Sequence, residues 1–570
     1  MASADHHVGV PKAPGRHRAR GRPALKGRQT DPEALADLRR LLGDLPRRAD
    51  LLVEHLHAIQ DGEGRLPRRA LTALAHELGM ALAEIYEVAS FYHNFDISDA
   101  AEPAPVTVRI CDSVVCEMYG ADALKQAIEK AAGTGVKVKT AACMGRCDQA
   151  PVVRIGNHYT TEASAADVVE RLTEAEPGRG LAPTAYPSIG DYEAAGGYAV
   201  LDRCRDGDLA VDEVLTCLED AVLRGLGGAG FPTGRKWRFV RAEPGPRLMA
   251  VNADESEPGT FKDRHYLLTD PHRFLEGTLI AAHVVEAADV YIYLRDEYPD
   301  CRQALETAIA ELVESGRELP TLHLRRGAGA YICGEESAML ESLEGKRGLP
   351  RHKPPFPSTV GLFGRPTLIN NVETLYWVRD ILDRGASWFA DQGRHGGRGI
   401  RAYSVSGRVA RPGVYVAPAG ITLSELLAEH CGGMAPGERL KGFLPGGASG
   451  GLMPADKADL PLDFGSLEPH GGLIGSAAIV VFSDRDSAAD IARNLMRFFA
   501  DESCGQCTPC RAGTEKSVTL MTDHKWDGDL ITELSACMSD ASICGLGQAA
   551  PNAPLTVMRY FADDLKDTAS

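Results

Sequence analysis

Several features that would assign the chain to a common class of protein are missing or scarce. There is no apolar run long enough to span a bilayer and no charged-then-apolar signal peptide at the start. Aromatic residues make up only 6% of the 570 residues, which offers no broad platform for stacking bases. Basic residues are outnumbered by acidic ones, and the net charge of -17 argues against nucleic acid as the main partner, because phosphate binding needs a basic face. We therefore expect a cytoplasmic protein that contacts neither membrane nor nucleic acid.

Cysteine, by contrast, is plentiful. Fourteen cysteines in a chain without a secretion signal predict reduced thiols, several of them metal ligands. The length corresponds to roughly three or four domains. With 44% hydrophobic and 25% charged residues, the composition is that of an ordinary soluble protein with material for several cores.

The densest group of cysteines lies close to the C-terminus, where Cys504, Cys507 and Cys510 follow C-x₂-C-x₂-C spacing. Adjacent disulfides could not all reach good geometry at this spacing. A short loop can instead point several sulfurs at one iron-sulfur cubane. Zinc sites also use C-x₂-C spacing, so a zinc site is the first alternative. The second alternative is that the three thiols bind no metal. The spacing leaves Cys537 and Cys544 as candidates for a fourth ligand.

A second group of cysteines follows two predicted strands, in pairs with C-x₄-C and C-x₃-C spacing. Four thiolates suit a 2Fe-2S cluster or a structural zinc ion. Zinc ribbons usually use C-x₂-C, so the wider spacings favour an iron-sulfur cluster. They also argue against redox-active C-x-x-C chemistry, because neither pair has that spacing. The predicted ligands are Cys111, Cys116, Cys143 and Cys147.

A glycine-rich loop in the middle of the chain matches the dinucleotide fingerprint G-x-G-x-x-G at Gly225, Gly227 and Gly230. The fingerprint requires a helix that opens at the loop and packs an apolar face on the sheet. The residues that follow, Pro232 to Lys236, make poor core. We therefore predict a loop whose backbone N–H groups approach a phosphate or a flat ring, with Lys236 neutralising charge.

An acidic loop follows the predicted buried strand that ends at Val251. Its carboxylates Asp254, Glu255 and Glu257 could accept hydrogen bonds from ribose hydroxyls, as acids in nucleotide sites do. A solvated acidic loop is the alternative. The alternation of strands and helices around this loop indicates an α/β sheet with crossover connections.

The strings that carry a family resemblance are GGAGFPTGRKW, NADESEPGTFKD, RGAGAYICGEE, KPPFP, INNVET, PGGASGG and SCGQCTPCR. With them, the chain from about residue 190 onward resembles the flavin-bearing, NADH-oxidising subunit of respiratory complex I. Residues 31 to about 175 resemble the thioredoxin-like 2Fe-2S subunit of that complex. The fusion of the two, the basic tail and the strings LPRHKPPFP and SCGQCTPCRAG are most similar to the β-subunit of cytosolic NAD-dependent formate dehydrogenases that contain molybdenum or tungsten. The diaphorase subunit of NAD-reducing hydrogenases is the second candidate.

The resemblance implies the fold class: a multidomain α/β protein in which a thioredoxin-like 2Fe-2S domain is fused to three further domains. These are an α/β FMN/NADH-binding domain, a small β-grasp-like domain and a C-terminal helical 4Fe-4S domain. The expected segments are a disordered basic tail (1–30), a helical bundle (31–98), the 2Fe-2S domain (99–176), a linker (177–190), the FMN/NADH domain (191–400), the β-grasp-like domain (401–483) and the 4Fe-4S domain (484–570). We expect the tail to dock on an acidic partner surface; its resemblance to a transit peptide is weaker.

The resemblance also implies which residues bind each cofactor. The FMN residues it implies are Gly227, Gly228, Lys236, Asn252, Asp254, Gly334, Asn370, Asn371 and Thr374. Those implied for NAD(H) are Phe231, Phe239 and Phe356 near the adenine, Glu257, Tyr331 and Lys353 around the nicotinamide, and Glu255, Glu335 and Glu336 beside them, with Glu257 and Glu255 as the catalytic pair. It points to Cys544 as the fourth cubane ligand.

The function implied is that of an NAD-dependent oxidoreductase subunit. Nicotinamide exchanges two electrons as a hydride and an iron-sulfur cluster exchanges one, so a flavin is expected between them. The expected partner is a molybdopterin-type formate dehydrogenase subunit with further iron-sulfur clusters, although no residue here reports on formate. A stand-alone NADH dehydrogenase and a zinc-stabilised scaffold are the alternatives from other classes.

Overall fold

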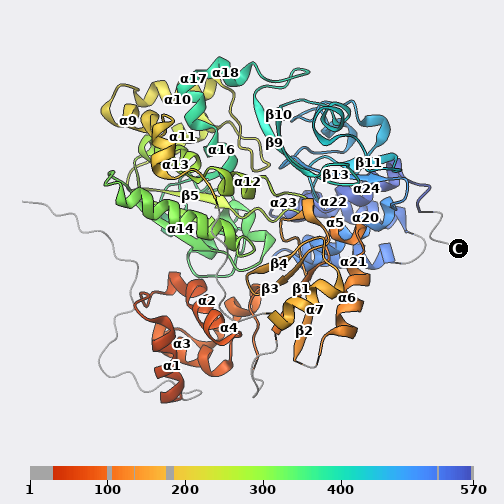
Figure 1. Ribbon diagram of the computed structural model, residues 1–570, viewed down its shortest axis with the longest axis horizontal. Coiled ribbons are helices and arrows are strands. Elements are labelled where there is room, and N and C mark those ends of the chain that lie inside the picture. Colours follow the sequence, from red (N-terminus) through yellow and green to blue (C-terminus); the bar gives the residue numbers. More distant parts are fainter. Residues whose placement is uncertain (1–29, 99–105, 134, 175–184, 523–525, 566–570) are drawn as a thin grey trace, which may run out of the picture.

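The computed structural model describes residues 30–98, 106–133, 135–174, 185–522 and 526–565 (Figure 1). The predicted basic tail, apart from Thr30, and most of the predicted linker lie outside these ranges. No helix among the described residues is long and apolar enough to cross a membrane.

The first described segment is a bundle of four helices, drawn in red in Figure 1. Leucines at helical spacing, such as Leu38, Leu56 and Leu71, are fully buried between them. The first helix begins where the Asp31 carboxylate accepts a hydrogen bond from the Glu33 N–H at 3.0 Å. The helices are α1 (Pro32–Leu42), α2 (Leu52–Glu63), α3 (Arg68–Leu78) and α4 (Leu82–Phe91).

The cysteine-bearing segment that follows is a four-stranded sheet with three helices. The strands lie in the order β2-β1-β3-β4, with β1 and β2 parallel. Because parallel strands end at the same edge of a sheet, Cys111 at the end of β1 lies near the loop that follows β2. The elements are β1 (Val106–Cys111), α5 (Val114–Met118), α6 (Ala121–Ala131), β2 (Val136–Ala141), β3 (Val153–Ile155), β4 (His158–Thr160) and α7 (Ala165–Glu174).

The central sheet is fully parallel, with strand order β7-β6-β5-β8. The chain runs from β5 outward to β6 and β7, and then returns to the other side of β5 as β8. Ligands of such sheets bind at the carboxyl edge where the order reverses, here between β5 and β8. The strands are β5 (Arg247–Ala253), β6 (Ala287–Leu294), β7 (Thr321–Arg326) and β8 (Thr367–Asn371).

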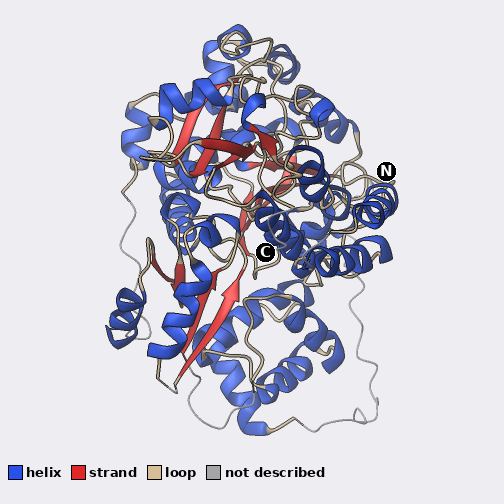
Figure 2. Ribbon diagram, turned by 90° about the vertical axis from the view of Figure 1, so that its right-hand side faces the viewer, coloured by secondary structure: helices blue, strands red, loops and turns tan. Residues whose placement is uncertain are grey.

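Helices cover both faces of this sheet (Figure 2). The helix α13 is buried along almost its whole length, including Phe274 and Leu279. The helices between residues 189 and 390 are α8 (Ile189–Ala194), α9 (Ala199–Asp206), α10 (Val211–Asp220), α11 (Thr233–Ala242), α12 (Lys262–Thr269), α13 (Pro271–Val285), α14 (Pro299–Glu314), α15 (Glu336–Leu343), α16 (Val372–Tyr376), α17 (Val378–Arg384) and α18 (Ala386–Ala390).

One expectation about the glycine-rich loop differs from the structure. A helix, α11, does open directly after the loop, and its Trp237 and Val240 are fully buried. The prediction that Pro232 to Lys236 make poor core is wrong for Thr233 and Gly234, which are buried, whereas Pro232 and Arg235 are exposed. However, no strand leads into the loop. In the described part of the chain, the only β-type pairing at Arg224 is an isolated bridge to Pro232. The loop is therefore no Rossmann fingerprint, although a helix follows it.

The last two segments are a five-stranded sheet and a group of helices. The sheet has the order β10-β9-β13-β11-β12, and its strands β9 and β13 are buried at every residue. The strands are β9 (Ile400–Gly407), β10 (Gly413–Pro418), β11 (Leu440–Leu444), β12 (Met453–Pro454) and β13 (Ala478–Ser483), with the short helix α19 (Leu423–Leu426). The helices that follow are α20 (Ala488–Asp501), α21 (Thr508–Thr522), α22 (Gly528–Ala541), α23 (Gly545–Ala549) and α24 (Asn552–Tyr560).

A buried carboxylate, Asp296, joins three of these segments. Its oxygens accept hydrogen bonds from Arg154 Nη2 at 3.1 Å, Arg326 Nε at 2.6 Å and Asn94 Nδ2 at 2.7 Å. The two arginines hold the pKa of Asp296 well below its usual range against the opposing effect of burial. Removing one partner from a buried group of charges leaves the others uncompensated.

We therefore expect Asp296→Asn to weaken the docking of the N-terminal segments on the central sheet by about 3 kcal/mol. Differential scanning calorimetry would show the first transition at lower temperature. Asp212→Asn, which alters an exposed pair with Arg238, is the matched control and should leave the transition unchanged.

The pH dependence gives a second readout of the same variant. A carboxyl with a depressed folded pKa contributes stability above its unfolded pKa of ~3.9, and that stability is lost as the pH falls through the folded value. The difference between wild type and Asp296→Asn should accordingly shrink in acid. Equal melting at neutral pH would show that Asp296 does not join the segments.

Candidate functional site

The candidate site lies at the carboxyl edge of the central sheet, where β5 and β8 end side by side. Asn252 and Asn371 are paired in register there. Asn252 Nδ2 donates to the Gly334 carbonyl at 2.8 Å, which ties the second glycine-rich turn to the sheet. The strand order thus brings together segments that are far apart in the sequence.

The first glycine-rich loop packs directly on this edge. A Cβ on Gly227 would stand 3.0 Å from the Asn371 Cβ, and Gly228 has a φ of +123° that L side chains rarely adopt. The Leu226 N–H donates to Thr374 Oγ1 at 2.9 Å, and Asn370 Oδ1 accepts from Trp237 Nε1 at 2.9 Å. Thr374 and Asn370 therefore hold the loop, and glycine lets the backbone lie close to the sheet.

Between the loop and the sheet is a cavity of about 360 Å³, which we call the flavin cavity. Ten of the residues predicted to bind FMN or NAD(H) line it: Gly227, Gly228, Asn252, Asp254, Glu255, Glu257, Tyr331, Gly334, Glu335 and Asn371. Its other walls include Gly446, Gly475 and Gly545, so much of the lining is bare backbone that a flat ring can approach closely. The cavity thus fits a flavin.

The remaining predicted residues lie outside this lining. Phe231, Phe239 and Phe356 are exposed, at 40%, 47% and 56%, and the first two rings have centroids 6.4 Å apart. A second group is ionic: Lys353 Nζ lies 2.9 Å from Glu335 Oε1 and 2.7 Å from Glu336 Oε1. Lys236 Nζ is 3.9 Å from a Glu336 oxygen and donates to the Ile369 carbonyl at 3.1 Å, and burial lowers its pKa.

The acidic loop is not solvated: Glu255 is buried, and Asp254 and Glu257 are half-buried against the flavin cavity. Burial raises the pKa of Asp254 to about 7, and it raises the pKa of Glu257 as well. Tyr331 Oη donates to Glu257 Oε2 at 2.5 Å, and the Ser449 N–H donates to Glu257 Oε1 at 2.7 Å. A carboxyl that titrates near neutrality in a cavity is typical of functional sites.

Glu255 differs from its neighbours because both of its carboxylate oxygens already have protein partners. Oε1 accepts from the Asp263 N–H at 2.8 Å, and Oε2 accepts from the Arg264 N–H at 3.1 Å and from Tyr298 Oη at 2.9 Å. Burial raises its pKa to about 7. The side chain therefore fixes the start of α12.

A smaller cavity adjoins the flavin cavity and is lined by four thiols. Cys504, Cys507, Cys510 and Cys544 surround it with apolar neighbours that include Ile332 and Leu546. Burial raises the pKa of Cys510 to about 11 and that of Cys544 to about 12, so a bound cation is needed to hold these sulfurs as thiolates. Four converging sulfurs in an apolar surround fit an iron-sulfur cluster.

Cys537 is exposed on α22 and does not line this cavity.

The other cysteine group is fully buried at the edge of the sheet formed by β1 to β4. The Sγ atoms of Cys143 and Cys147 are 3.4 Å apart, and Cys111 contacts both Cys116 and Cys143. The structure thus brings together both predicted thiol quartets.

Sequence reasoning missed several residues that line the flavin cavity. Ile332 and Leu546 line both it and the thiol cavity, and a buried Lys262 pairs with Asp263 at 2.8 Å and Glu373 at 2.9 Å. Ser449 comes from the string PGGASGG in the small sheet. Its glycines were a signal that could have marked it as part of the site.

Four protein-family models match successive parts of the chain. They are a thioredoxin-like [2Fe-2S] ferredoxin (residues 38–176), the Nuo51 FMN-binding domain (218–380), an SLBB domain (403–453) and the NADH-ubiquinone oxidoreductase-F iron-sulfur binding region (490–568). The predicted fold class is confirmed by these matches. So are the predicted cofactors FMN, NAD(H), 2Fe-2S and 4Fe-4S.

Curated relatives match the larger part of the chain. The F 2 subunit of the NADH-quinone oxidoreductase of Rhizobium meliloti (strain 1021) is 43% identical over 389 residues, which are 65% of this chain and 92% of that protein. The corresponding F subunit of Streptomyces coelicolor is 40% identical over 376 residues, 63% of this chain and 83% of that one. A solved NAD⁺-reducing [NiFe]-hydrogenase structure, in the air-oxidized state, aligns with a TM-score of 0.81 at 33% identity and covers 92% of this chain and 95% of that one.

The site at the carboxyl edge, the two thiol quartets and these similarities lead to one assignment. The chain belongs to the family of NADH-quinone oxidoreductase F subunits, joined to a thioredoxin-like 2Fe-2S domain, and it is an NADH-binding, FMN-dependent electron-transfer protein of the diaphorase type.

Proposed function

We propose that the chain is the NAD(H)-FMN electron-transfer subunit of a formate dehydrogenase complex whose partner is a molybdopterin-type catalytic subunit. The observation that carries the electron-transfer part is the wall shared by the flavin cavity and the thiol cavity, formed by Ile332 and Leu546. When bound, FMN exchanges a hydride with nicotinamide and single electrons with the clusters. The thin apolar wall excludes water between the two centres.

The roles of the site residues are part of the proposal. The glycine loop and Asn252, Asn371 and Gly334 hold the flavin, with Lys236 as its cation. The exposed Phe231, Phe239 and Phe356 offer flat surfaces for the adenine, which suits their position outside the flavin cavity. The ionic group of Lys353, Glu335 and Glu336 lies toward the nucleotide.

The contacts of the two residues in the predicted catalytic pair support different roles for Glu257 and Glu255. Glu257, held by Tyr331 and Ser449, faces the flavin cavity and orients the nicotinamide. Glu255 acts as a positioning residue, because its oxygens hold α12 and Tyr298. With the proposed domain boundaries near residues 98, 177–190, 400 and 484, Glu255 and Glu257 belong to the FMN/NADH domain, and Ser449, which holds Glu257, belongs to the β-grasp-like domain.

Formate is proposed on the resemblance of the fused segments, the basic tail and the strings LPRHKPPFP and SCGQCTPCRAG to formate dehydrogenase β-subunits. The second candidate is the diaphorase subunit of an NAD-reducing hydrogenase. The similarity to the hydrogenase structure over nearly the whole of both chains favours it. In both cases the reducing equivalents of the partner's substrate reach NAD⁺ through the same flavin.

The partner is tested by isolating the chain with whatever co-purifies and measuring NAD⁺ reduction with formate and with hydrogen. We expect formate-dependent reduction that requires the partner, and NADH-dependent dye reduction by this chain alone. Hydrogen-dependent reduction without any formate activity would assign the chain to the second candidate.

The flavin site is tested with Lys236→Ala. We expect FMN content and NADH–dye turnover to fall by roughly 100-fold, because the variant loses a half-buried cation that is expected to lie close to the phosphate. Arg238→Ala is the control, since it removes a neighbouring charge that faces Glu219 and Asp212 on the outer side. Full FMN content in Lys236→Ala would refute the assignment of this lysine.

The cubane ligands are tested by comparing Cys544→Ser with Cys537→Ser. The first should lose the iron and the electron paramagnetic resonance signal of the 4Fe-4S cluster, because it removes one of the four thiols that line the cavity. The second alters an exposed thiol and should keep both. Retention of the cluster in Cys544→Ser would rule out this ligand set.

A further inference from the structure

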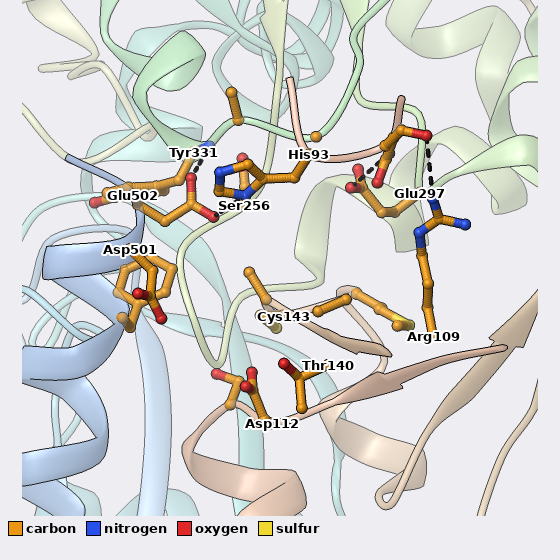
Figure 3. Close-up of a pocket in the computed structure, with 18 of the residues that line it drawn as sticks. His93, Arg109, Asp112, Thr140, Cys143, Ser256, Glu297, Tyr331, Asp501 and Glu502 are labelled. Atoms are coloured by element: carbon orange, nitrogen blue, oxygen red, sulfur yellow. Dashed lines mark hydrogen bonds and ion pairs between the residues drawn. The ribbon is translucent and has the colours of Figure 1, made fainter. Parts of the chain in front are cut away.

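A cavity of about 460 Å³ lies where four segments of the chain meet (Figure 3). We call it the polar cavity, since most of its lining side chains are charged or polar. They include His93 from the helical bundle, Asp112 and Cys143 from the 2Fe-2S domain, Arg295 from the central domain, and Asn494 and Glu502 from the last. Of these six side chains, only Cys143 has a role assigned above, as a predicted 2Fe-2S ligand.

The chemistry of the lining suits water. Ser113 Oγ and Asn494 Oδ1 are buried in the wall and have no hydrogen-bond partner among the described residues. Buried polar atoms are nearly always satisfied, and a polar cavity of this size accommodates several water molecules. The His93 side chain, which lines the cavity, is 51% exposed.

The polar cavity and the flavin cavity share part of their walls. Asp254, Ser256 and Tyr331 line both. Asp254 lies just beyond the end of β5 and is half-buried, and its Oδ1 accepts a hydrogen bond from Ser256 Oγ at 2.6 Å. It is the one carboxylic acid that borders both spaces, since Glu255 and Glu257 line only the flavin cavity and Glu297, Asp501 and Glu502 only the polar one, among the residues that the structure describes.

We propose that Asp254 carries protons between the flavin cavity and the water of the polar cavity. The inference rests on the proposed function. Oxidation of one NADH to NAD⁺ yields two electrons, which pass to the clusters, and one proton. The Asp254 carboxylate forms an O–H bond with that proton on the flavin side and breaks it by donating to water on the other side. Reduction of NAD⁺ runs the same transfer in reverse.

The direct way out of the flavin cavity does not serve this purpose. A nucleotide bound beside the flavin would cover part of the flavin cavity, and the wall toward the thiol cavity is apolar at Ile332 and Leu546. Electrons can cross such a wall, whereas a proton needs hydrogen-bonding groups. The polar cavity supplies such groups through Asp254 and Ser256, which line both cavities.

The electrostatics around Asp254 suit a group that both accepts and donates. Burial raises its pKa to about 7, and the charges of Glu297 and Glu502 act in the same direction. The Arg295 guanidinium and the Ser256 hydroxyl oppose this by favouring the carboxylate. A proton carrier works best when its pKa is close to the working pH.

The test is a single turnover of the full-length protein, loaded with FMN and both clusters, mixed with NADH in a weakly buffered solution. Flavin and cluster absorbance report electron transfer, and a pH-indicator dye reports proton release. In the wild type we expect the two to coincide. In Asp254→Asn we expect proton release to lag by roughly 100-fold, because the amide cannot take up the proton.

Two variants separate a carrier from a structural role. Asp254→Glu keeps a carboxylic acid and should restore synchronous release. Ser256→Ala removes the hydrogen bond that favours the carboxylate, so the pH midpoint of the release rate should rise while FMN content stays constant. This second variant keeps the proposal testable even when Asp254→Asn fails to bind FMN.

The outcomes distinguish this inference from the proposed function. Unchanged dye kinetics in Asp254→Asn that retains FMN, or an unshifted midpoint in Ser256→Ala, would overturn the proton role and leave the flavin assignment intact. Failure of NADH to bleach the flavin or reduce the clusters in the wild type would overturn the proposed function itself.

Discussion

The architecture depends on how several carboxylates are kept in one buried place. Asp254, Glu255 and Glu257 follow β5 within four positions, and burial of like charges is costly unless each is paired, hydrogen-bonded or protonated. The structure uses the last two of these solutions. Backbone N–H groups and Tyr298 satisfy Glu255, Tyr331 and Ser449 hold Glu257, and Asp254 titrates near neutrality. The elements that supply these partners are therefore bound to the loop.

Arg295 shows how the same constraint joins the domains. Its guanidinium donates to the Glu255 carbonyl and, at 2.6 Å, to the Cys143 carbonyl, and it pairs with Glu297 at 3.1 Å. Tyr298, close to it in sequence, leaves no room for a side chain at Gly145, where a Cβ would come within 2.1 Å of its hydroxyl oxygen. One buried cation thus connects the acidic loop with the loop that presents a cluster cysteine. The two redox sites cannot shift independently.

The three cavities divide the chemistry by their linings. Bare backbone and carboxylates surround the space that suits a flat ring, thiols and apolar side chains surround the space that suits a cluster, and charged groups surround the largest. Electrons tolerate an apolar wall and protons do not. The loop after β5 borders two of these spaces, and Ile332 and Leu546 border the other pair, so the shared walls decide which particle can pass.

Much of this could be predicted from the chain alone, because the signals are local. Thiols at C-x₂-C-x₂-C, C-x₄-C and C-x₃-C spacing, leucines at helical spacing and glycines after strands each depend on neighbours a few residues apart. What depends on distant segments was decided only by the tertiary structure. Spacing could not separate Cys537 from Cys544 as a candidate ligand, whereas in the tertiary structure Cys544 lines the thiol cavity beside Ile332 and Cys537 is exposed. The hydrogen bonds to the Glu255 oxygens come from Tyr298, in the cap of α14, and from the start of α12. Asp254 borders two cavities only because four segments of the chain meet there. Such hydrogen bonds and cavities form between surfaces that are far apart in the sequence, and no local pattern encodes them.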